Sequence, residues 1–278
     1  VDTNKARMKV QHRAQIESLA YSLLAAVLVV VFIQTIGVWR WLSEELGKTG
    51  AMLVPFLVAI LLLIFVFVAR LRKKEQSQFH WLYLVAALVL VGIALSLPDS
   101  RFPAKRIHVA EFMLLAFVLR RGFCRWSSGV PLIVMTAATG IVLGAHDELI
   151  QGLHPDRYFG HRDIVVDGLS AIAGALAGHG LRLYDTVPKR EENWIVPPWW
   201  SLAAVAVGLV VFLYPLPELI KAPLPWWTLT SLLTAAFVWN VLDRTPRAAG
   251  DPASIAAWLV FVLVIYPVLT HTPIAIFQ

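Results

Sequence analysis

Long apolar runs alternate with short charged segments along this chain. A helix that crosses the hydrocarbon core needs about 20 apolar residues, and fewer where charged side chains at its ends reach the headgroups. The pattern therefore predicts an all-α, polytopic integral membrane bundle of about nine spanning helices. The expected spans are residues 19–38, 51–69, 80–97, 107–119, 130–145, 164–183, 199–216, 225–242 and 254–270.

The fourth run is the shortest, and it contains Glu111. A carboxylate within a span is costly, so we expect this helix to tilt, to thin the bilayer locally, or to be shielded by neighbouring helices. The first run is expected to be a retained anchor, because it is long enough to span and no small-residue cleavage site follows it.

Basic residues are divided unequally between the two sides that these spans define. Sixteen of the 24 Lys and Arg residues fall on the side of the N-terminus, and eight fall on the other side. Lys and Arg near span ends favour the cytoplasm, so the N-terminus is predicted to be cytoplasmic. The loop between the fifth and sixth spans is then extracytoplasmic.

Composition supports a membrane protein and excludes some other classes. Hydrophobic residues make up 58% of the chain and charged residues 15%, which leaves too little charge for the surface of a soluble domain. The net charge is +6, but no basic stripe interleaved with aromatic residues is present, so nucleic-acid binding is not expected. Cys124 is the single cysteine, which excludes an internal disulfide and any Cys-based metal centre built from this chain alone.

The chain is predicted to have three parts, and the longest polar break marks the boundary between the second and the third. It covers residues 187–198 and ends in Pro197 and Pro198, which disfavour helix immediately before Trp199. The parts are two N-terminal membrane helices with basic loops at 1–79, a core of four helices at 80–185, and a linker with three further helices at 186–278.

Ionisable residues concentrate in one stretch, residues 144–178, between the fifth and sixth spans. Its polar residues are His146, Asp147, Glu148, Gln151, His154, Asp156, Arg157, His161, Arg162, Asp163 and Asp167. Helical spacing places Glu148 and Gln151 on one face, and Asp163 and Asp167 on another. Pro155 and Gly160 predict a turn between them, either re-entrant or at the surface.

A second polar pattern precedes the fourth span. Lys105, His108 and Glu111 recur at every third position, so a helix would present a cation, an imidazole and a carboxylate along one inclined face. An unpaired Glu111 would be expected to take up a proton or find a cation, whereas structural pairing is the alternative interpretation. Arg157 is suited to bind a carboxylate or a phosphate bidentately, and its charge would keep Glu148 or Asp163 ionised.

Three kinds of chemistry are relevant to these residues: metal binding, acid/base catalysis and nucleophilic catalysis. His146, Asp147, Glu148, His154, His161 and Asp163 include metal-ligand types, but no spacing matches a specific ligand signature, so no metal or cofactor is predicted. Asp147 and Glu148 with Asp163 are the alternative, a paired-carboxylate acid/base site. No nucleophile motif is present. The question of catalysis stays open, with Glu148, Asp163 and His108 as the candidates.

Small residues line one face of the sixth predicted helix. Ser170, Gly174 and Gly178 lie four residues apart, a pattern that lets a neighbouring helix approach closely. Such packing would bring Asp167 beside the fourth and fifth spans. His179, near the other end of the helix, is expected to be a satisfied core or helix-end histidine.

The order of these residues resembles the VanZ-like family, named for a teicoplanin-resistance factor. A Lys-x-x-His pair before an apolar helix is followed by a Glu-x-x-Gln pair, a Pro, an Arg, an Asp and a small-residue helix. The matching residues are Lys105, His108, Glu148, Gln151, Pro155, Arg157 and Asp163, and the match covers about residues 80–183. Two positions depart, since Asp167 stands where Asn is usual and Ser170 where Gly is usual. The resemblance implies a bacterial envelope protein of the inner membrane whose polar cluster faces outward; it implies no particular reaction.

Two functional hypotheses follow. In the first, an extracytoplasmic polar pocket binds or modifies a phosphorylated or lipid-linked envelope component, with membrane lipids as partners and a link to antibiotic resistance. Its residues are Lys105, His108, Glu111, Glu148, Gln151, Arg157, Asp163 and Asp167. In the alternative, the chain is a non-catalytic subunit or assembly factor of a larger membrane complex, and the same charges form a structural ion-pair network. A transporter is a third class, but the sequence shows no inverted repeat.

Overall fold

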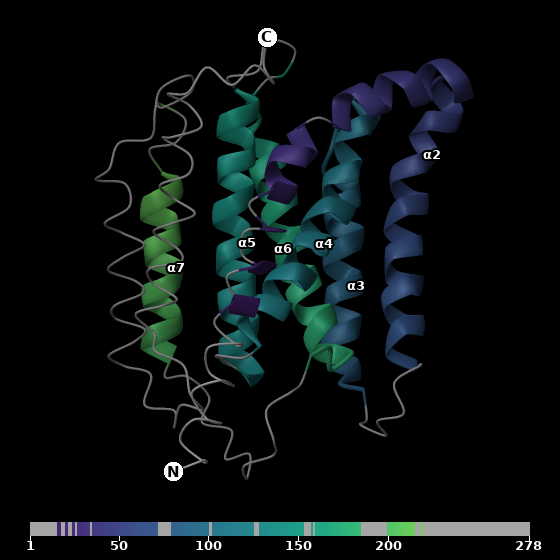
Figure 1. Cartoon of the computed structure of the whole chain (residues 1–278). Helices are drawn as coiled ribbons and strands as arrows, with labels where there is room; N and C mark the ends of the chain where they lie inside the picture. The colour runs from purple at the N-terminus through teal and green to yellow at the C-terminus, as the bar shows by residue number, and fades with distance from the viewer. Residues whose placement is uncertain are drawn as a thin grey trace.

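A computed structural model of the chain has helices and no strands among the residues that it describes. These are residues 16–17, 20–21, 24–25, 27–33, 35–71, 79–99, 102–124, 128–152, 157, 159–184, 199–214 and 218. The longer helices are α2 (Thr35–Leu71), α3 (Trp81–Ser96), α4 (Ile107–Phe123), α5 (Gly129–Gln151), α6 (His161–Gly180) and α7 (Trp199–Leu213). A short 3-10 turn, η1 (Pro103–Arg106), directly precedes α4. Figure 1 shows most of the helices running roughly side by side.

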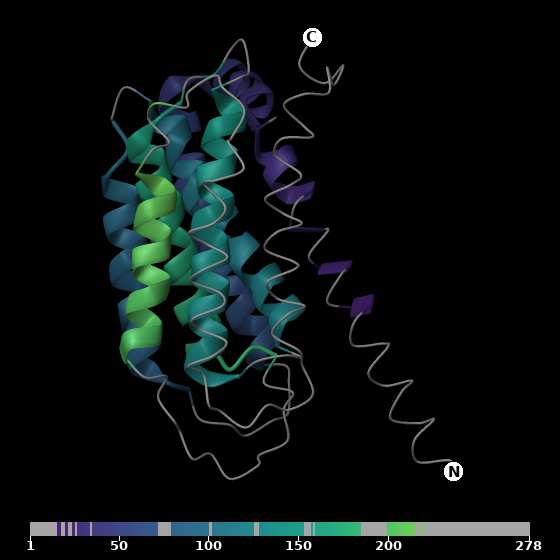
Figure 2. The ribbon, with the colours of Figure 1, turned by 90° about the vertical axis from the view of Figure 1, so that its left-hand side faces the viewer.

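Helix α6 is the centre of the bundle, since α3, α4 and α5 all pack against it. Helix α7 lies on the far side of α5, as the two ribbon views show (Figures 1 and 2). The end of α6 is joined to the start of α3, because the N–H of His80 donates to the carbonyl of Gly180 at 3.0 Å. Elements far apart in sequence therefore surround α6.

Glycines and alanines make this close packing possible. A Cβ added at Gly174 would lie 2.7 Å from the Cβ of Ala116 on α4, and one at Gly178 would lie 2.7 Å from Cδ of Arg120. On the other face of α6, a Cβ at Gly140 of α5 would lie 2.5 Å from that of Ala171. Because any larger side chain would separate the helices, the predicted close contact along the small-residue face of α6 is confirmed.

Helix α4 is buried along nearly its whole length. Phe112, Met113 and Leu115 have no exposed surface, and they pack in two apolar clusters that lie on either side of the helix. Of the three expectations for this short span, shielding by neighbouring helices is the one the structure supports. Its burial also places the first turn of α4, with His108 and Glu111, inside the protein.

The outer surfaces of α2 and α3 are strongly apolar. Exposed large side chains include Leu53, Phe65, Trp81 and Leu82. Among the described residues, Thr49–Val68 and Gly129–Gln151 are long and apolar enough to cross a membrane. The pair Val27–Ile33 and Thr35–Gly47, bent by 41°, adds a third if it forms one span. This arrangement is compatible with a membrane protein.

Several sequence-based expectations lie wholly or partly outside the described residues. The predicted spans at 225–242 and 254–270 do, as does the polar break at 187–198. The total of nine spans, the cytoplasmic N-terminus and the three-part division of the chain therefore stay predictions.

The predicted loop between the first two spans is wrong, because residues 39–50 are helical. Helix α2 begins at Thr35 and continues through this charged segment, with one non-helical residue at Gly47 (φ 68°, ψ 166°). Glu44 and Glu45 are exposed there, so a helix running along the end of the bundle keeps their charges out of the apolar interior. Gly47 tolerates the left-handed conformation that redirects the chain, and Figure 1 shows the resulting turn before the helix descends.

Candidate functional site

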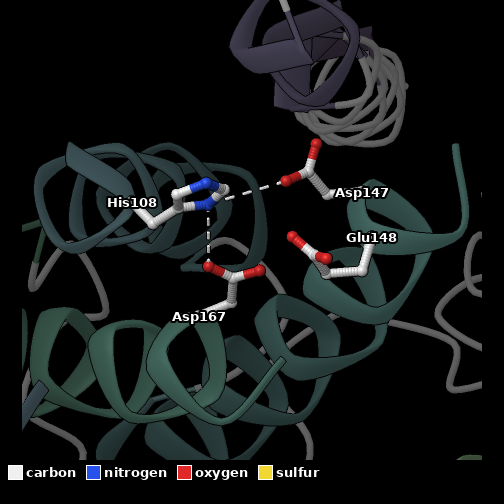
Figure 3. Close-up of side chains that lie close together, drawn as sticks. All are labelled: His108, Asp147, Glu148 and Asp167. Atoms are coloured by element: carbon white, nitrogen blue, oxygen red, sulfur yellow. Dashed lines mark ion pairs between the residues drawn. The ribbon is translucent and has the colours of Figure 1, made fainter. Parts of the chain in front are cut away.

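Four ionisable side chains from three helices converge near one end of the bundle: His108 of α4, Asp147 and Glu148 of α5, and Asp167 of α6. Figure 3 shows the three carboxyl groups turned toward the space beside the His108 ring. One nitrogen or oxygen atom from each residue lies within 4.8 Å of the corresponding atoms of the other three. We call these residues the acidic cluster.

The acidic cluster is enclosed by protein. His108 is 3% exposed, and Asp147, Glu148 and Asp167 are 0% exposed. Transfer of a carboxylate out of water is costly unless the charge is paired or hydrogen-bonded. Three carboxyl groups buried around one imidazole therefore require a compensating proton or cation.

His108 is the centre of the ion pairs in the acidic cluster. Its Nδ1 atom lies 3.1 Å from Oδ1 of Asp167, 3.7 Å from Oδ2 of Asp147 and 3.9 Å from Oε2 of Glu111. A protonated His108 carries one positive charge and faces more than one carboxylate. The imidazole alone thus cannot neutralise all the acidic groups that surround it.

Each member of the acidic cluster also has a buried polar atom without a hydrogen-bond partner among the described residues. These atoms are Nδ1 of His108, Oδ1 of Asp147, Oε1 of Glu148, and both carboxyl oxygens of Asp167. Buried polar atoms in native proteins are nearly always hydrogen-bonded, and exceptions call for an explanation. These four residues concentrate such exceptions at one place.

Two hydrogen bonds orient the carboxyl groups that α5 contributes. Gln151 donates from Nε2 to Oδ2 of Asp147 at 2.6 Å, one helical turn away. The backbone N–H of Gly160 donates to Oε2 of Glu148 at 2.8 Å. Because Gly160 immediately precedes α6, the second bond also joins the end of α5 to the start of α6.

Arg157 contacts the acidic cluster through Gln151. Its Nε atom donates to Oε1 of Gln151 at 3.0 Å, and Gln151 in turn donates to Asp147. The sequence left a carboxylate or a phosphate as the bidentate partner of Arg157; the observed hydrogen bond is to an amide and not to a carboxylate, and the phosphate stays a prediction. The physical reason is local, since Gln151 is in the last turn of α5 and Arg157 follows it after only six positions in the sequence.

Lys105 forms an ion pair with Asp163. The Lys105 side chain is 36% exposed and that of Asp163 is 4% exposed, so the pair lies where the polar region reaches the protein surface. A Cβ at Gly160 would collide with the Asp163 carboxyl group and lie 3.2 Å from Nζ of Lys105. Glycine at this position therefore permits the pair to form.

The eight predicted site residues all lie at this end of the bundle, in two groups. The inner group, His108, Glu111, Glu148 and Asp167, is buried. Lys105 and Arg157 are partly exposed, and together with their buried partners Asp163 and Gln151 they form what we call the rim. The expected single face of Lys105, His108 and Glu111 is only partly formed, because Lys105 belongs to η1 and pairs with α6, whereas His108 and Glu111 follow on α4.

Asp147 is the residue whose central position the spacing did not reveal. Sequence reasoning included it among possible ligands and acid/base groups, and the i, i+4 spacing with Gln151 was the available signal. Two other candidates do not join the cluster, since His146 directs Nδ1 to the carbonyl of Val142 at 2.7 Å and His161 is exposed. His154 lies outside the described residues.

Close contact between α5 and α6 brings their carboxyl groups together. A Cβ at Gly144 would lie 2.7 Å from the Cβ of Asp167, so the two helix backbones approach each other next to the acidic cluster. Ser170, which stands where Gly is usual in the family that the sequence resembles, is fully buried and donates to the carbonyl of Val166 at 2.6 Å. The hydroxyl is thus satisfied within its own helix.

Comparison of this chain with protein-family models, with curated proteins and with solved structures gives no match. The chemistry of the site is therefore the basis for assigning a function. An enclosed set of carboxyl groups and an imidazole can bind a cation or exchange protons, and the basic side chains of the rim can bind an anion.

Proposed function

We propose that this chain is a VanZ-like bacterial envelope protein, a multi-pass protein of the inner membrane that binds a phosphorylated or lipid-linked envelope component. One observation carries the proposal: Lys105 and Arg157 form the rim of a buried polar region inside an apolar helical bundle. Basic groups at the mouth of a membrane pocket are suited to a phosphate, because they supply both charge and hydrogen-bond donors.

The rim has donor capacity for such a ligand. Lys105 carries three N–H donors and Arg157 five, of which the contact with Gln151 uses Nε. Two oxygens of a phosphate fit the two terminal groups of a guanidinium in a bidentate pair. Lys105 would then exchange part of its interaction with Asp163 for one with the phosphate.

Lipid-linked ligands are favoured over free ones because the outer faces of α2 and α3 are apolar. Leu53 on α2 and Leu82 on α3 are exposed, as expected for side chains that contact acyl chains. An acyl or prenyl tail would remain in the bilayer while the headgroup enters the rim. His108 and Glu148, just inside the rim, supply groups able to exchange protons with a bound headgroup.

Binding of a long-chain polyprenyl phosphate to the full-length protein in nanodiscs tests this proposal. Arg157→Ala is expected to weaken binding by about tenfold or more, because a tenfold loss corresponds to about 1.4 kcal/mol, within the range of one charge-assisted hydrogen bond. The free prenol, which lacks the phosphate, is expected to bind no better to the wild type than to the variant.

Arg162→Ala is the matched control. Arg162 is an exposed arginine at the start of α6, and it donates a 3.5 Å hydrogen bond to the carbonyl of Leu97. Equal weakening by Arg162→Ala and Arg157→Ala would indicate nonspecific attraction to the lipid phosphate. Unchanged binding and unchanged teicoplanin susceptibility in folded Arg157→Ala and Glu148→Gln variants would refute the proposal.

The alternative is a non-catalytic subunit or assembly factor of a larger membrane complex. One observation favours it: the ion pairs of His108 and of Lys105 join α4, α5 and α6, as a purely structural network would. Gentle detergent extraction followed by mass analysis of the particle distinguishes the two. A heteromeric particle would favour the alternative, and a monomer or homodimer would count against it.

A further inference from the structure

We propose that His108, Asp147, Glu148 and Asp167 bind one divalent cation of the first transition row, with Zn²⁺ and Mn²⁺ as the probes. This inference goes beyond the binding of an envelope component, and it does not depend on the phosphate ligand. Mixed imidazole and carboxylate donors suit these ions, whereas purely oxygen donors suit Mg²⁺ and Ca²⁺.

The distances fit one ion after a small side-chain adjustment. Zn²⁺ binds nitrogen and oxygen at about 2.0–2.2 Å, so neighbouring ligands of a tetrahedral site are about 3.4 Å apart. Nδ1 of His108 lies 3.1 Å from Asp167 and 3.7 Å from Asp147, which is close to this separation. The largest separation within the set is 4.8 Å, so a shift of about 1 Å in a carboxyl group is sufficient.

Unpartnered buried atoms point independently to a ligand. Each of the four residues has at least one such atom among the described residues, and the side chains converge in Figure 3. Gln151 and the N–H of Gly160 meanwhile hold the carboxyl groups of Asp147 and Glu148 in place. Metal sites commonly have this arrangement, in which surrounding hydrogen bonds orient the ligands.

The charges around the acidic cluster also favour a divalent cation. With three carboxylates and a neutral imidazole, a 2+ ion leaves one negative charge, whereas an imidazolium alone leaves two. Glu111 of α4 adds a further acidic group next to His108. The neighbouring basic groups, Lys105 and Arg157, contact Asp163 and Gln151 at the rim. A divalent cation at the centre would therefore offset more of the negative charge than an imidazolium does, where the basic side chains do not reach.

A charged His108 held by ion pairs, without a metal, is the rival arrangement. His108→Lys separates the two, because lysine keeps a positive charge in the cluster but removes the imidazole ligand. Under the rival arrangement the wild type has no specific metal site, so this variant would leave the bound metal unchanged. Under our proposal the variant binds the stoichiometric metal ion much more weakly than the wild type does.

The experiment measures bound metal in the full-length protein purified in detergent. The protein is stripped with a chelator, dialysed and titrated separately with Zn²⁺, Mn²⁺, Mg²⁺ and Ca²⁺, and bound ions are counted by mass spectrometry of the elements. We expect one Zn²⁺ or Mn²⁺ per chain. Loss of a ligand in His108→Lys or Asp167→Asn should weaken this binding by about a hundredfold or more, since loss of even an orienting partner costs 10–100-fold.

Controls distinguish this site from adventitious binding. His161→Ala removes an exposed histidine and Glu44→Gln an exposed carboxylate, and both should leave the stoichiometry and affinity unchanged. Lys105→Ala should weaken polyprenyl phosphate binding and leave the metal count unchanged, so the failure of one proposal is separable from the failure of the other.

A spectroscopic measurement keeps the test independent of variant folding. X-ray absorption of the Zn²⁺-loaded wild type should report one nitrogen and about three oxygen neighbours at about 2.0–2.2 Å. The proposal is overturned if the wild type binds no stoichiometric ion, if His161→Ala removes the ion, or if folded His108→Lys and Asp167→Asn variants bind it as tightly as the wild type.

Discussion

The two ends of α6 both lie among buried charged side chains, but among the described residues only one end has buried arginine side chains that donate to backbone carbonyl groups. Near its C-terminus, Arg70 donates to the carbonyl of Leu181 at 2.8 Å and Arg120 donates to that of Leu183 at 2.9 Å. In its N-terminal half, Asp167 faces His108 and two further carboxyl groups, and neither of its carboxyl oxygens has a hydrogen bond among the described residues. We call these the arginine end and the acidic end.

The arginine end follows the ordinary electrostatics of a helix terminus. The last carbonyl groups of a helix have no partner within the helix, and cations are favourable there. Arg70 donates to the carbonyl of Leu181, the residue that caps α6, and Arg120 donates to that of Leu183 just beyond the helix. The rings of His80, Tyr83 and His179 pack beside the end of α6. The expectation that His179 is a packed helix-end residue is confirmed, since its ring stacks on that of His80.

At the acidic end, the charge near a helix C-terminus has the opposite, unfavourable sign. Asp147 and Glu148 lie near the C-terminus of α5, where a negative charge is unfavourable. Their mutual proximity adds repulsion that the ion pairs of one histidine do not remove. A buried charge that binds backbone groups is thus explained by stability, whereas buried carboxyl groups gathered around one imidazole, with oxygens that lack a hydrogen bond among the described residues, indicate a site.

The largest effect is expected at the arginine end. Arg120→Ala should lower the free energy of unfolding by about 3 kcal/mol or more, because it removes a fully buried side chain and the donor to the Leu183 carbonyl. Thermal denaturation of the full-length protein in detergent measures the change. A loss no greater than that of a surface variant would show that the arginine end is not a structural clamp.

An intermediate effect is expected where α5 contacts α6 beside the acidic end. Gly144→Ala places a methyl group 2.7 Å from the Cβ of Asp167, so the helices must separate at a cost of about 1–3 kcal/mol. Zn²⁺ affinity should fall with it. Gly168→Ala is the control, because its Cβ would lie 3.5 Å from Ile141, an ordinary contact. If Gly144→Ala and Gly168→Ala change the stability and the Zn²⁺ affinity equally, the geometry of the acidic cluster does not depend on this helix contact.

The smallest effect, of opposite sign, is expected at the acidic end itself. In the presence of a chelator, Asp167→Asn should raise stability by about 1 kcal/mol or leave it unchanged, because it removes a buried acidic group at nearly constant shape. The same denaturation experiment with Zn²⁺ should show the wild type stabilised more than the variant, since a ligand that binds only the folded state raises its stability. A substantial loss of stability in chelator would make Asp167 a structural residue like Arg120.

Much of the local structure was predictable from the chain. Apolar runs anticipated α3 to α7, and the spacing of Ser170, Gly174 and Gly178 anticipated the close face of α6. The expectation of a loop at residues 39–50 was wrong, because charged residues mark the end of an apolar run but do not end a helix. Helix continues wherever exposed charges remain outside the apolar interior.

The sequence by itself determined which residues carry charge, which predicted helices they lie on, and which face of α6 lets a neighbouring helix approach closely. Only the tertiary structure decided that Asp147 joins His108 while the adjacent His146 turns to Val142. Successive helical residues differ by about 100° in direction, so the packing angle of each helix selects which side chain faces its neighbours. That rotation depends on contacts among α4, α5 and α6 together, and no spacing along a single helix encodes it.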